Sequence, residues 1–67
     1  MRFRKLKKKI SSYNGATIVV PYEGIYFELN NGILYERIPL CDGELVRERS
    51  FDQVPLQCIN YFSRQLR

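Results

Sequence analysis

Two runs rich in apolar, aromatic and β-branched residues, 25–29 and 33–38, lie on either side of a short polar segment. Residues of these types are enriched in strands. Asn31 and Gly32, in the segment between the runs, both tolerate the positive φ that tight β-hairpin turns require. The sequence therefore predicts an antiparallel hairpin over 25–38, and the rest of the chain has to be arranged around it.

The sequence leaves the register of this hairpin open. With a two-residue turn Leu29 faces Leu34, and Glu36 becomes the one charge on the apolar face. With a three-residue turn Leu29 faces Ile33, and the charge on that face is Arg37. Because side chains alternate between the two faces of a strand, this one-residue difference reverses which side of the second strand is buried.

A shorter strand is predicted ahead of the hairpin. Residues 16–20 are mostly β-branched, and Pro21 is expected to end the strand because proline has no N–H to donate to a sheet. Residues 21–24 carry a proline early and a glycine last, which is typical of a turn. The next strand is expected to begin at Ile25.

A second hairpin is predicted around Asp42 and Gly43, a pair that favours tight turns. Because Pro39 precedes the turn, we expect the strand to bulge, bend or lie at a sheet edge there. A two-residue turn gives three cross-strand pairs: Leu40 with Leu45, Arg37 with Glu48, and Glu36 with Arg49. The two charge pairs are complementary, each worth on the order of 0.2 to 1 kcal/mol, and they favour this register. The segment 16–49 is therefore interpreted as an antiparallel meander.

The last segment, 52–66, has the periodicity of an amphipathic helix. The residues on its apolar face are Pro55, Cys58, Ile59, Phe62 and Leu66. Asp52 is the predicted N-cap, which leaves Pro55 in the first turn, where a missing N–H costs least. A capping box from Ser50 to Gln53 is the competing start, and it would place Pro55 deeper in the helix.

The first segment, 1–14, is predicted to be a lysine-rich helix. Its apolar residues recur at steps of three and four, at Phe3, Leu6, Ile10 and Tyr13. The helix is expected to end at Asn14 and Gly15, where a left-handed cap is easy to form. A basic strand or arm is the alternative, because like charges repel along so short a helix.

These elements predict one small α+β domain over residues 1–67. We expect an antiparallel meander or small, partly open barrel of about four strands. The C-terminal helix should cover one apolar face, and a basic N-terminal helix or arm should precede the strands. A chain of this length buries only about 60% of its unfolded surface, so the core is expected to be thin.

The charge of the chain is concentrated at its start. Of its 11 basic residues, six lie within the first nine positions: Arg2, Arg4, Lys5, Lys7, Lys8 and Lys9. The remaining residues carry a small net negative charge. A basic cluster of this density attracts polyanions, which include nucleic acid, an anionic membrane face and the acidic surface of another protein.

The sequence offers no set of residues for catalysis or metal binding. It has no histidine, and its seven carboxylates are scattered among turns, caps and cross-strand pairs. Cys41 and Cys58 are too few for a zinc site and are expected to be reduced thiols. The single glycines do not form a phosphate-binding loop. We therefore expect a protein that is not an enzyme and that uses no cofactor and no metal.

What remains is binding, and the leading hypothesis is a basic N-terminal surface that contacts nucleic acid or a nucleoprotein. The ligand would be DNA or RNA, bound with weak sequence specificity, because no recognition-helix or RNA-module motif is present. Tyr22, Tyr26 and Tyr35 are candidate stacking groups if a sheet face is open, although tyrosines in so small a protein more often fill its core. If they act together, the basic cluster should lie near the face that carries the tyrosines.

The alternative is a protein–protein interaction module, such as an inhibitor, an adaptor or a subunit of a larger assembly, that binds an acidic protein surface. Homodimerisation through a sheet edge is a further hypothesis. A membrane-surface role is a weaker one, because the N-terminal segment would form a basic amphipathic helix. The sequence shows no secretory signal and no transmembrane segment, and we expect a cytoplasmic protein.

Overall fold

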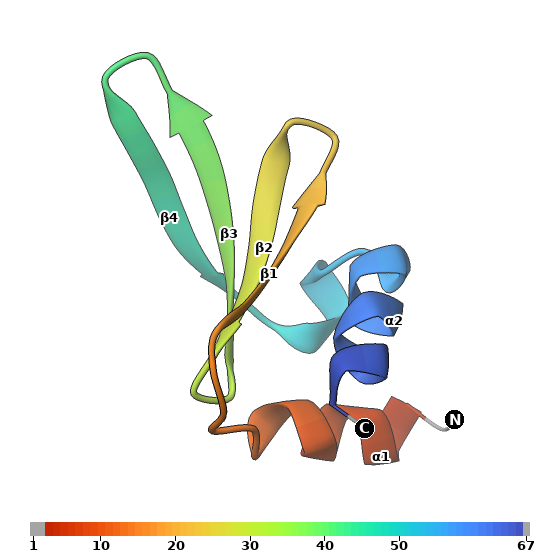
Figure 1. Ribbon diagram of the computed structural model, residues 1–67. Coiled ribbons are helices and arrows are strands. Elements are labelled where there is room, and N and C mark those ends of the chain that lie inside the picture. The colour runs from red at the N-terminus through yellow and green to blue at the C-terminus, as the bar shows by residue number, and fades with distance from the viewer. Residues whose placement is uncertain (1–2, 67) are drawn as a thin grey trace.

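The computed structural model describes residues 3–66, which form two α-helices, one 3₁₀ turn and four strands (Figure 1). The elements, in chain order, are α1 (Phe3–Ser11), β1 (Ile18–Tyr22), β2 (Ile25–Asn30), β3 (Ile33–Leu40), β4 (Gly43–Arg49), η1 (Phe51–Gln53) and α2 (Leu56–Gln65). The strands form one antiparallel sheet in the order β1-β2-β3-β4. The predicted α+β class is confirmed, and the sheet is an open meander.

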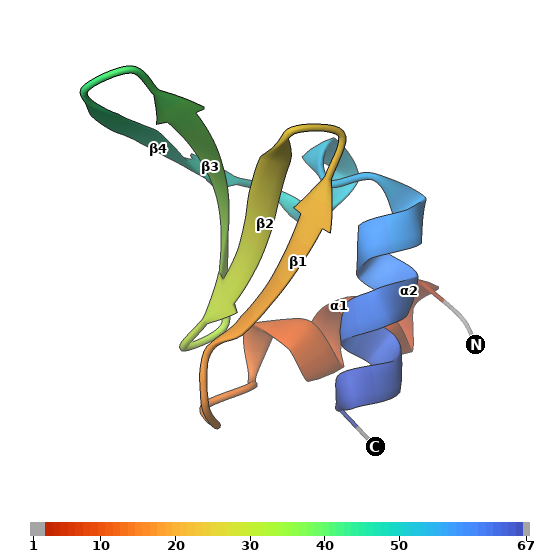
Figure 2. The same ribbon diagram turned by 45° about the horizontal axis from the view of Figure 1, so that its top comes forward.

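Both helices lie on the same side of the sheet. Figures 1 and 2 show α2 alongside β1 and α1 crossing below α2, near the β2–β3 turn, while the β3–β4 hairpin extends away from the helices. The buried core is shared by the two helices and this face of the sheet. Its apolar members are Leu6, Ile10, Val20, Phe27, Leu29, Leu34, Val54, Cys58, Ile59 and Phe62.

The β2–β3 hairpin has the two-residue turn. Asn31 and Gly32 have φ of 50° and 78°, and Leu29 lies opposite Leu34. Two successive positive φ values match the primed turn whose twist suits a hairpin. The register therefore places Glu36 on the helix-covered face of the sheet, opposite Phe27.

The Glu36 carboxylate is neutralised by two arginines of the neighbouring strand. Arg47 Nη2 lies 3.0 Å and Arg49 Nη2 lies 3.1 Å from Glu36 Oε1. The predicted Glu36 and Arg49 contact is thus present. It forms diagonally across the sheet, however, because the residue directly opposite Glu36 is Arg47.

The predicted register of the β3–β4 hairpin is wrong by two residues. Leu40 lies opposite Gly43, so that the turn residues are Cys41 and Asp42, and Leu45 lies opposite Ile38. The observed turn lies one residue earlier in the chain than the predicted one, and the two strands therefore form one more residue pair. Because the shift in register is an even number of residues, every side chain keeps the predicted face.

The second predicted charge pair of this hairpin, Arg37 with Glu48, does not form. Arg37 lies opposite Val46, and its Nε donates to Glu28 Oε1 at 2.6 Å on the adjacent strand β2. Its Nη1 also donates to Glu44. The prediction failed because it considered only β4, whereas a residue of a central strand has neighbours on both sides.

Strand β1 differs from its prediction at both ends, because it begins at Ile18 rather than at residue 16 and continues through Pro21. The turn that follows consists of Glu23 and Gly24, with φ of 47° and 87°, and Tyr22 pairs with Ile25. In such a hairpin the pair next to the turn is hydrogen-bonded and the following pair is not. The nitrogen of Pro21 therefore points away from β2, at the outer edge of the sheet, where a missing N–H breaks no ladder bond.

Pro39 lies within β3, beyond the last residue of β3 that pairs with β2, Arg37. At this point β3 has a partner on one side only, so the predicted edge position is confirmed locally. The missing N–H of Pro39 also prevents extension of the β2 pairing. The β3–β4 hairpin continues beyond it as two strands.

The C-terminal helix starts later than predicted, and Asp52 does not cap it. The competing Ser50 and Gln53 arrangement is the one that forms, with the main-chain nitrogen of Ser50 donating to Gln53 Oε1 at 3.0 Å. It closes the single turn η1, the chain becomes extended at Val54, and α2 begins after Pro55. Proline is compatible with a helix start but not a helix interior, which explains the break.

The N-terminal segment is the predicted helix and not a strand, but α1 ends at Ser11 rather than at Asn14 and Gly15. The hydroxyls of Ser11 and Ser12 donate to the Lys8 carbonyl at 3.0 and 2.9 Å. These hydrogen bonds from side chains to the main chain lie where the main-chain hydrogen bonds of the helix end. The predicted helical positions 1 and 2 lie outside the described residues.

Candidate nucleic-acid interface

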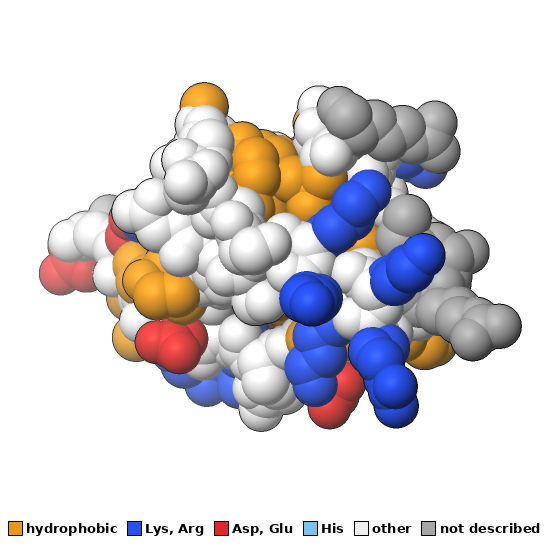
Figure 3. All heavy atoms as spheres, turned by 90° about the horizontal axis from the view of Figure 1, so that it is seen from below, with side chains coloured by type: hydrophobic (Ala, Val, Ile, Leu, Met, Phe, Trp, Pro, Cys, Tyr) orange, Lys and Arg blue, Asp and Glu red, His pale blue; other side chains and the backbone are white. Residues whose placement is uncertain are grey.

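The basic residues of α1 form one exposed surface, which we call the α1 cationic surface. Leu6 and Ile10 are buried and fix which side of the helix faces the core. At 100° per residue, the cations occupy the rest of the helix surface, and all of those described are exposed: Arg4, Lys5, Lys7, Lys8 and Lys9. Figure 3 shows Lys and Arg side chains gathered over this part of the molecule. Arg2, the sixth predicted member, lies outside the described residues.

The cations of α1 differ from the arginines of the sheet in their partners. All four ion pairs among residues 3–66 are made by Arg37, Arg47 or Arg49. Within the same described part of the chain, none of the α1 cations has a carboxylate within ion-pair distance. The positive charge of the sheet is therefore compensated internally, and that of α1 is presented to solvent.

The three candidate tyrosines do not join the α1 cationic surface. Tyr26 is 44% exposed and Tyr35 is half-buried. Both alternate along their strands with core residues, and so they lie on the outer face of the sheet, opposite the helices. Tyr22 lies on the helix side with its ring edge-on to Phe27 at 6.1 Å. Its pKa is raised above the ordinary value, first by the neighbouring Glu23 carboxylate and then by burial.

The outer face of the sheet is acidic as well as aromatic. Glu28 is 6% exposed there and is held by Arg37, whose guanidinium also bonds to Glu44. The hydrogen bond to Glu28 is the largest cause of the raised pKa of Arg37. By register, Glu48 shares this face with Glu28 and Glu44. The carboxylates outnumber the single arginine, so this face is a poor site for phosphates even though its tyrosines are accessible.

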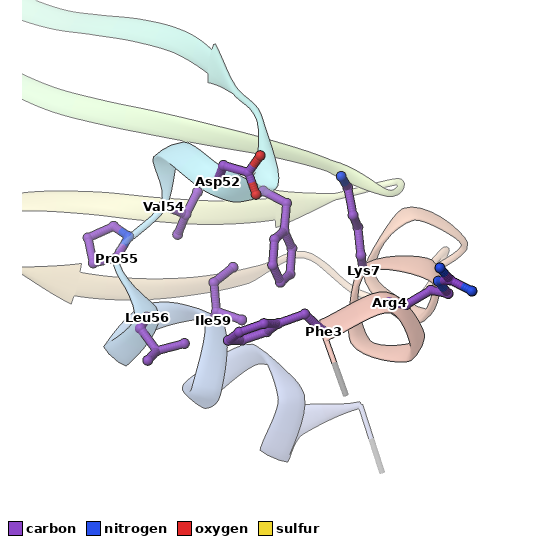
Figure 4. Close-up of a pocket in the computed structure, with 9 residues that line it drawn as sticks. Phe3, Arg4, Lys7, Asp52, Val54, Pro55, Leu56 and Ile59 are labelled. Carbon is purple, nitrogen blue, oxygen red and sulfur yellow. The ribbon is translucent and has the colours of Figure 1, made fainter. Parts of the chain in front are cut away.

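A groove that the sequence did not predict opens beside the α1 cationic surface. It lies between the first half of α1, η1 and the start of α2, and has a volume of about 740 Å³. Phe3, on α1, and Leu56, on α2, both line the groove and are 61% and 55% exposed. Figure 4 shows Lys7 and Asp52 with their charged ends at one side of the groove, and Arg4 pointing away from it.

The groove went unpredicted because its walls come from both ends of the chain. The sequence predicts Phe3 on the buried stripe of the first helix, whereas Phe51 lies outside both predicted helices. The apolar residues around Val54 come together only because the chain is extended between η1 and α2. The one sequence signal that could have revealed the groove was the Ser50 to Gln53 capping pattern, which places this break.

The two cysteines differ in accessibility. Cys41 is exposed in the β3–β4 turn, whereas Cys58 is fully buried on the core side of α2, and both are free thiols. Burial raises the pKa of the Cys58 thiol because the thiolate is disfavoured away from water.

We expect a thiol reagent such as dithionitrobenzoate to modify Cys41 rapidly and Cys58 only when the chain unfolds. At mildly alkaline pH the rate ratio should reach at least about 100, because Cys58 reacts through rare opening of the native state. Mass spectrometry of peptides after timed quenching measures both rates. In urea the two rates should converge, and equal rates without denaturant would contradict the buried position of Cys58.

Among residues 3–66, no three His, Cys, Asp or Glu side chains are grouped closely enough to hold a metal ion. No helix within that same range is long and apolar enough to cross a membrane. The site consists of a cationic helix surface and an adjoining apolar groove. Comparison with known proteins adds no relative, since no family model, curated protein or solved structure matches the chain.

Proposed function

We propose that this chain is a small, non-enzymatic binding protein that contacts nucleic acid or a nucleoprotein through the α1 cationic surface. The observation that carries the proposal is the set of exposed cations on one helix, without acidic partners among the described residues. Phosphate groups are the ligands that such a surface attracts most strongly, and release of their counterions supplies the free energy. The proposal includes no cofactor and no metal. We also propose that the protein acts in the cytoplasm.

The same surface supports weak rather than strong sequence specificity. Four of its five described cations are lysines, whose ammonium groups are flexible point charges. Phosphate contacts position a protein on nucleic acid, whereas base contacts specify the sequence. Arg4 is the one described residue of α1 with the planar, bidentate geometry that reads a guanine edge.

The proposal is tested by measuring binding of labelled DNA and RNA, single-stranded and duplex, across a salt series. We expect binding near physiological salt that weakens steeply as salt rises. In Lys5/Lys8/Lys9→Gln the slope of log K against log salt should become shallower by about 2 to 3, because each lost phosphate contact removes roughly 0.7 to 0.9. Fluorescence anisotropy measures the affinities, and circular dichroism checks that the helices remain.

The matched control is Gln57→Glu/Asn60→Asp/Gln65→Glu, at exposed positions of α2. It lowers the net charge by the same three units with nearly isosteric side chains, while α1 is unchanged. We expect this variant to keep the slope of the parent within about one unit, because only local contacts set the slope. An equal loss in both variants would show attraction by overall charge alone. Absence of binding to every probe at low salt would overturn the proposal.

The second candidate function is a protein–protein interaction module that binds an acidic protein surface. It is favoured by the groove, where Phe3 and Leu56 expose apolar surface next to the cations. Exposed apolar surface with a charged rim is characteristic of interaction sites. In this case, reversing the charge of the α1 lysines should slow association more than it increases dissociation.

Homodimerisation through a sheet edge remains a prediction. Strand β4 offers the longer free edge, since it pairs with β3 alone and its residues 43–48 are exposed. The free N–H and C=O groups of such an edge can add another strand. A monomeric mass by light scattering at high concentration would rule this mode out.

A further inference from the structure

We propose that the groove between α1, η1 and α2 holds one unpaired base of a single-stranded nucleic acid whose phosphates contact α1. This inference rests on the proposed function and names its ligand class. The groove adjoins the α1 cationic surface, because Arg4 and Lys7 line it together with Phe3. A strand that follows the cations therefore passes the opening of the groove.

The aromatic ring of Phe3 provides the stacking surface. It packs edge-to-face against Phe51, with ring centroids 6.2 Å apart and an interplanar angle of 69°. Such a contact holds the ring in place, and the residue as a whole is still 61% exposed. The buried side chain of Ile59 also lines the groove, as Figure 4 shows. A planar base laid on Phe3 would thus cover apolar surface that is otherwise exposed to water.

The charges around the groove match a nucleotide, which combines an anionic phosphate with a neutral base. Lys7 can hold a phosphate, and the Asp52 carboxylate, at the same side of the groove, is a hydrogen-bond acceptor. The exocyclic amino group of cytosine, adenine or guanine is a donor of the kind that Asp52 can bind. An acidic peptide would bring a carboxylate to Lys7 as well, but it has no neutral aromatic ring with amino donors to match both Phe3 and Asp52.

A base can reach Phe3 only when it is unstacked and unpaired, so the groove selects single strands. Stacking of bases on aromatic side chains is the usual way in which proteins hold single-stranded nucleic acid. Duplexes would contact the α1 cations through their phosphates but would leave the groove empty. We therefore expect two separable contributions, one from the cations for any nucleic acid and one from Phe3 for single strands.

The test compares three probes of equal length: an oligodeoxycytidine strand, an abasic strand with the same phosphates, and a duplex. In Phe3→Ala we expect affinity for the oligodeoxycytidine strand to fall about tenfold, towards that of the abasic strand. Affinity for the abasic strand and the duplex should stay unchanged. Tyr26→Ala is the matched control, since Tyr26 is also an exposed aromatic residue but lies on the outer face of the sheet. It should leave all three affinities as they are.

The outcomes separate this inference from the proposed function. Equal affinity of the unmodified protein for the oligodeoxycytidine and abasic strands would overturn the base site and leave the cationic surface intact. An equal loss for all three probes in Phe3→Ala would overturn it too, because α1 would then have been displaced. Polyglutamate is measured as a further probe, and the base site would also be overturned if Phe3→Ala lost polyglutamate binding but kept strand binding. The groove would then belong to an acidic peptide. Absence of binding to all three probes would overturn the proposed function itself.

Discussion

Phe62→Ala is expected to leave a large fraction of the chain unfolded at room temperature. Phe62 is fully buried and lies in the core that the sheet shares with both helices. Truncating a buried phenylalanine typically costs about 3 to 5 kcal/mol. A domain of 67 residues has a free energy of unfolding of only about 3 to 10 kcal/mol. The loss is therefore comparable to the whole stability of the protein.

Urea unfolding followed by circular dichroism measures this effect. In Phe62→Ala we expect the folded baseline to be shortened or absent. Phe3→Ala makes the same chemical change at a residue that is 61% exposed, so its free energy of unfolding should fall by no more than about 1 kcal/mol. Similar midpoints for the two variants would show that the core is not centred on Phe62.

Gly32→Ala is expected to destabilise the protein far more than Gly24→Ala. Both glycines are at the second position of a two-residue hairpin turn, with φ of 78° and 87°. An alanine at either position has to adopt the left-handed conformation, at a cost of about 1 to 2 kcal/mol. At Gly32 its Cβ would also lie 2.3 Å from the carbonyl oxygen of Ser11, whereas nothing lies within 4 Å at Gly24.

The difference between these two variants isolates the contact that holds the end of α1 against the β2–β3 turn. The clash at position 32 is between the alanine Cβ and the main-chain carbonyl oxygen of Ser11. Neither atom can move by rotation of a side chain, so the backbone of α1 or of the turn has to shift. We expect the Gly32→Ala midpoint in thermal unfolding to lie well below that of Gly24→Ala, with the extra cost on the order of 1 to 3 kcal/mol. Equal midpoints would show that α1 is not anchored at this turn.

The elements of the fold were largely predictable because they depend on local signals. The turn at Asn31 and Gly32 and the helical stripe around Cys58 and Phe62 were recognised from residue types and spacing. The β3–β4 register was not, because Asp42 and Gly43 are a pair typical of tight turns, whereas the turn that forms consists of Cys41 and Asp42. The turn that forms gives the two strands one further residue pair, and the number of pairs depends on the whole length of the hairpin.

The candidate site was predictable only in part. The cations of α1 were recognised because charge is visible in a sequence, and Leu6 and Ile10 fixed the side on which they face solvent. The sequence did not show that Tyr26 lies apart from those cations. This separation depends on which face of the sheet the helices cover. The groove depends on contacts between Phe3 and Phe51, which are far apart in the chain.

The position of Pro21 limits how this protein can assemble. Its nitrogen faces outward on β1, so that the outer edge of this short strand lacks one of its few donors. Only β4 then offers a full row of main-chain groups to another chain. Two chains joined through their β4 strands would leave only the β1 edges free, and each of these is interrupted by Pro21. If strand addition occurs, we therefore expect a pair of molecules rather than a filament.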